Sequence, residues 1–113
     1  MNALSGHKAW LVQRLTALYL AVYTLIALAC LAVFGLPADA AAWRALFAGP
    51  GMNLFTLGFF LALIWHAWIG VRDVVVDYVH PVWIRLAVLS FFGIGFLLCA
   101  VWASRALFNA MAL

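Results

Sequence analysis

The stretch LTALYLAVYTLIALACLAVF, residues 15–34, contains no charged side chain. A helix needs about 20 apolar residues to cross the roughly 30 Å hydrocarbon core of a bilayer, and this stretch meets that length. No Lys, Arg, Asp or Glu lies between Arg44 and Arg72, and residues 86–104 are uncharged as well. The sequence therefore predicts three membrane-spanning helices, at about residues 12–34, 52–74 and 82–108.

The composition of the whole chain supports this interpretation. The 113 residues are 71% hydrophobic and 8% charged, whereas a soluble domain carries roughly a quarter charged residues. We therefore expect an all-α integral membrane protein, with residues 1–113 forming a single membrane domain. The few charged residues are scattered and form no basic patch, so the sequence does not indicate nucleic-acid binding. Cys30 and Cys99 lack metal-ligand spacing and are expected to be small buried hydrophobic residues.

The distribution of basic residues predicts the orientation in the membrane. Cytoplasmic loops carry an excess of Lys and Arg. The side that holds the N-terminus and the loop after the second span carries Lys8, Arg14, Arg72 and Arg85. The opposite side carries only Arg44 and Arg105. The N-terminus is therefore expected in the cytoplasm. The absence of an Arg- and Ser-rich presequence favours a bacterial inner membrane.

His66 is an ionisable residue inside the second apolar stretch, and such a residue marks a site by default. Gly58, Ala62 and Gly70 lie at four-residue intervals from it, so the four positions form one stripe on a helix. This stripe could be a packing face on which His66 donates a hydrogen bond to another helix. It could equally be a shallow groove for haem, with the imidazole ligating the iron. A proton-relay histidine is a third possibility.

A haem that transfers electrons in the low-spin state needs two axial ligands. The other histidines, His7 and His80, lie near the inner membrane boundary, too far in depth from His66 to reach the same iron. If His66 is a haem ligand, we expect the second ligand to come from another subunit.

Acidic and aromatic residues follow the second span. Asp73 and Asp77 share the face of His66 if the helix continues that far. Asp77 and the adjacent Tyr78 could act as an acceptor and donor pair at the mouth of a lipid-accessible cavity. They could also belong to an ordinary solvated loop of mixed charge.

In the segment HAWIGVRDVVVDY, residues 66–78, ten residues separate His66 from the pair Asp77 and Tyr78. This segment, the three-span architecture and the opening LVQRLTALYL of the first span resemble the hydrophobic membrane anchor subunit of succinate dehydrogenase. The resemblance implies a subunit of succinate:quinone oxidoreductase, or respiratory complex II, that is not an enzyme on its own. It also implies three partners: a cytochrome b-type membrane subunit, an iron–sulfur subunit and a flavoprotein subunit.

The resemblance assigns roles to four residues and no catalytic residue. His66 would be the axial metal ligand of haem b. The Tyr78 hydroxyl would bond a quinone carbonyl, with Asp77 helping to order that site. Arg14 would lie near the haem propionates, or would simply mark the inner end of the first helix.

Two other functions remain open at this stage. A haem-free anchor would use His66 only for packing. A small multi-span transporter or proton-relay protein would need a polar lining, and the first and third spans offer only Thr16, Tyr19, Tyr23, Thr24, Ser90 and Ser104.

Overall fold

The computed structural model describes residues 6–111, and every regular element in that range is an α-helix. Three helices are long: α1 (Gly6–Phe34), α3 (Pro50–Tyr78) and α4 (Val82–Met111). A short helix, α2 (Ala40–Leu46), lies between the first two. The long helices are of sufficient length and hydropathy to cross a membrane. The predicted all-α fold with three apolar spans is confirmed, whereas α2 was not foreseen from the sequence.

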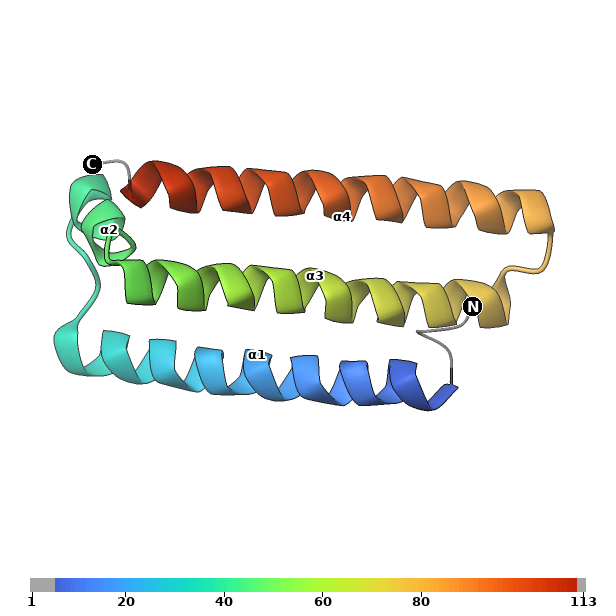
Figure 1. Ribbon diagram of the computed structural model, residues 1–113, viewed down its shortest axis with the longest axis horizontal. Coiled ribbons are helices and arrows are strands. Elements are labelled where there is room, and N and C mark those ends of the chain that lie inside the picture. The colour runs from blue at the N-terminus through green and yellow to red at the C-terminus, as the bar shows by residue number, and fades with distance from the viewer. Residues whose placement is uncertain (1–5, 112–113) are drawn as a thin grey trace.

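The three long helices lie side by side, with α3 between α1 and α4 and in contact with both (Figure 1). The molecule is 50 Å long. A helix of 29 residues rises about 43 Å, so these helices extend past a hydrocarbon core of about 30 Å. We call the end with the start of α1, the end of α3 and the start of α4 the N-terminal end. The end that carries α2 is the far end.

The turns at the far end follow from local sequence. Gly35 has a φ of 82°, the left-handed conformation in which glycine commonly terminates a helix, and it ends α1. The Asp39 carboxylate accepts a hydrogen bond of 2.8 Å from the Ala42 N–H and caps α2. Pro50 occupies the first turn of α3, where its missing N–H costs nothing. These residues reverse the chain between the first two spans.

Hydroxyl groups on α1 define its contact with α3. The Tyr19 hydroxyl donates to the Phe55 carbonyl at 2.7 Å, and the Tyr23 and Thr56 hydroxyls are 2.8 Å apart in a buried pair. Gly58 permits the first of these contacts, because a Cβ at that position would overlap the Tyr19 hydroxyl. Unsatisfied polar groups are costly in lipid, so these bonds fix how the two helices pack.

Asn53 joins the helices at the far end through hydrogen bonds of its side chain. Its side chain is 4% exposed, and its amide donates to the Phe47 carbonyl at 2.8 Å and to the Leu107 carbonyl at 2.7 Å. Phe47 is the C-cap of α2, and Leu107 lies on α4. One side chain therefore connects three helices.

Most apolar side chains are exposed in this chain. Phe34 is 84% exposed and Trp102 is 78% exposed. Cys30 and Cys99 are also exposed and unpaired, so the expectation that they are buried is wrong. A surface this apolar must face lipid or another membrane subunit.

Candidate functional site

His66 points from α3 towards α1. Its Nδ1 atom lies 3.1 Å from the Thr16 hydroxyl oxygen, and its side chain is half-buried. This is the interhelical hydrogen bond that the packing interpretation predicts. The other ring nitrogen, Nε2, has no hydrogen-bond partner among residues 6–111. Nε2 therefore remains able to bind a ligand.

A cavity of about 520 Å³ opens beside His66 between α1 and α3. We call it the N-terminal cavity. Its size falls within the range of about 300–1,000 Å³ that is usual for ligand sites. Its wall is made by Gly6, Ala9, Trp10, Gln13, Arg14 and Ala17 of α1 and by His66, Ile69, Arg72 and Asp73 of α3. The structure thus brings His66 and Arg14, two of the four predicted site residues, to one cavity.

The wall of the N-terminal cavity carries two cations and one carboxylate. The Arg72 guanidinium pairs with the Asp73 carboxylate at 3.0 Å. The Arg14 guanidinium carbon lies 5.7 Å from the centroid of the Trp10 ring, close enough for a cation–π contact. The wall has a net positive charge and is suited to an anionic group such as a carboxylate.

Gln13 adds an unsatisfied polar group to the same wall. Its Oε1 atom is buried and has no hydrogen-bond partner within the described part of the chain. The two ends of an amide are interchangeable by a flip, so this position can present either an acceptor or a donor. Buried polar atoms without partners are uncommon in proteins, and a bound water, an ion or a functional role is the usual explanation.

Asp77 and Tyr78 lie outside the N-terminal cavity. Helix α3 is continuous to Tyr78, as the prediction that Asp73 and Asp77 share a helix face with His66 requires. Asp73 reaches the cavity wall beside His66. Tyr78 is 77% exposed, and Asp77 is exposed as well. Along a continuous helix Tyr78 is about 18 Å from His66 and about 120° around the axis. The predicted residues therefore divide between two places.

Arg85 organises the turn that follows Tyr78. From the first turn of α4, its Nε donates to the Val79 carbonyl at 3.0 Å and its Nη2 to the Val76 carbonyl at 3.3 Å. Carbonyls at a helix C-terminus lack partners within the helix, and basic side chains commonly satisfy them. The sequence interpretation used Arg85 only as a topology signal and missed this role, which required knowing that the two helix ends meet.

The remaining histidines do not complete a metal centre within the chain. His7 stacks on Trp10 with ring centroids 5.8 Å apart, and His80 is exposed after the end of α3. Within residues 6–111, no three His, Cys, Asp or Glu side chains are grouped so that they could hold a metal ion. A metal at His66 would need its other ligands from outside this set.

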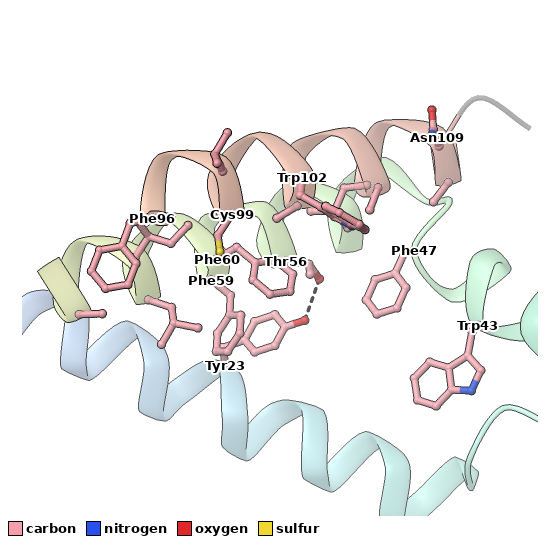
Figure 2. A pocket seen from close by; sticks show the side chains of 18 of the residues that line it. Tyr23, Trp43, Phe47, Thr56, Phe59, Phe60, Phe96, Cys99, Trp102 and Asn109 are labelled. Carbon is pink, nitrogen blue, oxygen red and sulfur yellow. Dashed lines mark hydrogen bonds between the residues drawn. The ribbon is translucent and has the colours of Figure 1, made fainter. Parts of the chain in front are cut away.

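A larger cavity, of about 1100 Å³, lies at the far end. Figure 2 shows its aromatic lining, which includes Phe59, Phe60 and Trp102, and the hydrogen bond between Tyr23 and Thr56. None of the predicted site residues lines it. This apolar cavity is therefore separate from the polar N-terminal cavity.

Two comparisons place these features among known proteins. Residues 1–104 match the family described as succinate dehydrogenase/fumarate reductase transmembrane subunit. The succinate dehydrogenase hydrophobic membrane anchor subunit of Coxiella burnetii is 36% identical over 105 residues, which cover 93% of this chain and 90% of that protein. The similarity extends over α1, α2, α3 and most of α4.

Proposed function

The chain belongs to the succinate dehydrogenase/fumarate reductase transmembrane subunit family, and we propose that it contributes half of a haem site and part of a quinone site to that complex. The resemblance noted in the sequence is confirmed at the level of the family. The chain is a multi-pass membrane anchor subunit, and the other subunits of the complex are its partners. The haem site, the quinone site and the residues that form them are what we propose beyond this membership.

The N-terminal cavity has the chemistry that haem b requires. His66 presents an unpartnered ring nitrogen for the iron, and Arg14 offers a cation to a propionate carboxylate. The unpartnered Gln13 amide gives the wall a further polar group. Haem, when bound, supplies one-electron chemistry at its iron. Because His66 is the one histidine that lines this cavity within residues 6–111, the second axial ligand would come from the cytochrome b-type membrane subunit.

The end of α3 has features suited to quinone binding. The exposed Tyr78 hydroxyl can donate a hydrogen bond to a quinone carbonyl. Asp77 beside it is exposed and places a carboxylate next to that hydroxyl. Quinone reduction consumes protons, so a polar pair at the membrane boundary serves it well. Arg85 holds the following turn in place.

The charge distribution supports an orientation for this assembly. Lys8, Arg14, Arg72 and Arg85 lie on the helix segments at the N-terminal end. By the positive-inside rule this end would face the cytoplasm of a bacterium. The iron–sulfur and flavoprotein subunits would then dock there, next to the quinone and haem residues.

Two alternatives can be weighed against the contacts. The bond between Thr16 and His66 favours a haem-free anchor as the second candidate, because packing alone would produce it. A transporter is less well supported, since the hydroxyls of Thr16, Tyr19 and Tyr23 are engaged in bonds to α3. They do not line an open polar path.

The quinone proposal is tested by replacing Tyr78 with Phe in the intact complex, purified through a tag on this chain. Loss of one hydrogen bond of about 1 kcal/mol predicts a KM for quinone raised roughly fivefold to tenfold. Reduction of a water-soluble dye by succinate, which does not need the quinone pocket, serves as the internal control and should not change. An unaltered KM for quinone in Tyr78→Phe would rule out this role of the hydroxyl.

A further inference from the structure

The contacts around Thr16 decide the direction of its hydrogen bond to His66. The Thr16 hydroxyl oxygen lies 2.8 Å from the Val12 carbonyl and 3.1 Å from both the Gln13 carbonyl and His66 Nδ1. A carbonyl can only accept, and the contact with Val12 has the usual length of an O–H···O bond. We assign the single hydroxyl hydrogen to the Val12 carbonyl, which makes the shortest of the three contacts. The hydroxyl oxygen is left to accept a hydrogen from Nδ1.

With this direction, the hydrogen of a neutral His66 ring is assigned to Nδ1. A neutral imidazole carries one hydrogen, and a hydrogen on Nδ1 leaves Nε2 with a free lone pair. Nε2 has no partner among the residues that the structure describes. Thr16 itself is not part of the cavity wall, although its neighbours Gln13 and Ala17 are. Any influence of Thr16 on a molecule in the cavity would pass through the imidazole.

We propose that Thr16 is the positioning residue of the haem ligand: it holds the ring of His66 and keeps Nε2 unprotonated towards the iron. This inference rests on the proposed ligation of haem by His66. Two successive hydrogen bonds connect the α1 backbone to the ring, from Nδ1–H to the hydroxyl and from the hydroxyl to the Val12 carbonyl. Partners of this kind orient a ligating histidine and raise its basicity.

A more basic imidazole stabilises ferric over ferrous iron. Removing the hydroxyl should therefore raise the reduction potential of the haem. The unsatisfied Nδ1–H and the freer ring should also weaken haem binding, because loss of such a partner typically costs 10–100-fold in metal affinity. A purely structural threonine would produce neither effect.

The test compares Thr16→Val with Thr16→Ser in the intact complex. Valine keeps the shape of threonine without the hydroxyl, whereas serine keeps the hydroxyl without the methyl group. Thr24→Val, at an exposed position on the same helix, is the matched control. We would measure the haem midpoint potential, the electron paramagnetic resonance signal of the ferric haem and the rate of haem transfer to an excess of apomyoglobin.

Thr16→Val should show a higher potential, an altered ferric signal and haem loss at least about tenfold faster. Thr16→Ser and Thr24→Val should match the wild type. If Thr16→Val keeps the wild-type potential and haem loss, or if Thr16→Ser behaves like Thr16→Val, the positioning role is wrong. Thr16→Ala also removes the hydroxyl and decides the question if Thr16→Val does not assemble.

Different outcomes would overturn the ligation by His66 and the role of Thr16. A wild-type complex without haem, or a His66→Ala complex that retains haem unchanged, overturns the proposed ligation. Loss of haem in His66→Ala together with an unchanged Thr16→Val overturns only the role of Thr16.

Discussion

Arg14 and His66 reach the N-terminal cavity from different helices, one with a guanidinium group and the other with an imidazole ring. Neither residue alone identifies a cofactor site, because a basic residue at a helix end and a packed histidine are both ordinary. Their convergence on one cavity, beside a buried Gln13 oxygen without a partner, distinguishes this site. The proposed roles of the two residues can be separated by potential measurements.

Replacing Arg14 with Gln should lower the midpoint potential of the haem. A nearby cation disfavours the additional positive charge of ferric iron, so removing it favours the oxidised state. An interaction of about 1 kcal/mol at a partly screened site corresponds to roughly 40 mV for a one-electron couple. Redox titration of the purified complex checks the shift, and Arg105→Gln near the end of α4 is the control. A rise in potential, or equal shifts in both variants, would refute the proposed pairing.

At this scale the sequence predicted His66 and Arg14 at one site and Asp77 and Tyr78 at another, and the structure brings His66 and Arg14 to one cavity that does not include Asp77 or Tyr78. Helical spacing correctly placed Asp73 on the face of His66. The sequence did not indicate that Thr16, Asn53 and Arg85 form hydrogen bonds to distant segments. Their bonds join segments far apart in the chain, for which periodicity gives no signal.

At the scale of helices, the pairing of α1 with α3 supports the whole candidate site. Thr16, Tyr19 and Tyr23 lie on one face of α1, and each hydroxyl contacts α3. Gly58 belongs to the small-residue stripe predicted around His66, and it makes room for Tyr19. A Cβ added at Gly70 of the same stripe would contact no other helix within 4 Å, so only part of the stripe is used for packing among residues 6–111.

Gly58→Ala should weaken the contact between these helices. The new Cβ would displace the Tyr19 hydroxyl and break its bond to Phe55, at a cost of about 1–3 kcal/mol. We expect the apparent melting temperature of the complex in detergent to fall by a few degrees. Gly95→Ala, where nothing lies within 4 Å, is the matched control and should not lower it. Equal melting temperatures for the two variants would contradict this packing role.

The long helices were predictable because uncharged runs of this length have few other structures available in a membrane. Their ends were less predictable: α1 begins at Gly6 and α3 continues to Tyr78, beyond the apolar runs that defined the expected spans. Helix α2 was missed because hydropathy does not detect a short helix outside a span. The Asp39 cap before a run of alanines was the available signal.

At the scale of the whole molecule, the chain is an incomplete unit. Among residues 6–111 only a few side chains are buried, and the exposed surface is rich in Leu, Phe and Trp. Lipid can cover part of this surface, and we propose that the other membrane subunit of the complex covers a further part. The single imidazole at the N-terminal cavity fits this arrangement, because a two-ligand haem would join the two membrane subunits across their contact.

The most direct test is the reduced-minus-oxidised visible spectrum of the complex, purified in mild detergent through a tag on this chain, for wild type and His66→Ala. His80→Ala, which changes an exposed histidine after the end of α3, is the control. We predict a b-type haem signal in the wild type and in His80→Ala, and a signal that is lost or shifted in His66→Ala. A wild-type complex with all its partners but without haem, or a normal haem signal in His66→Ala, would contradict the claim that this chain supplies an axial ligand.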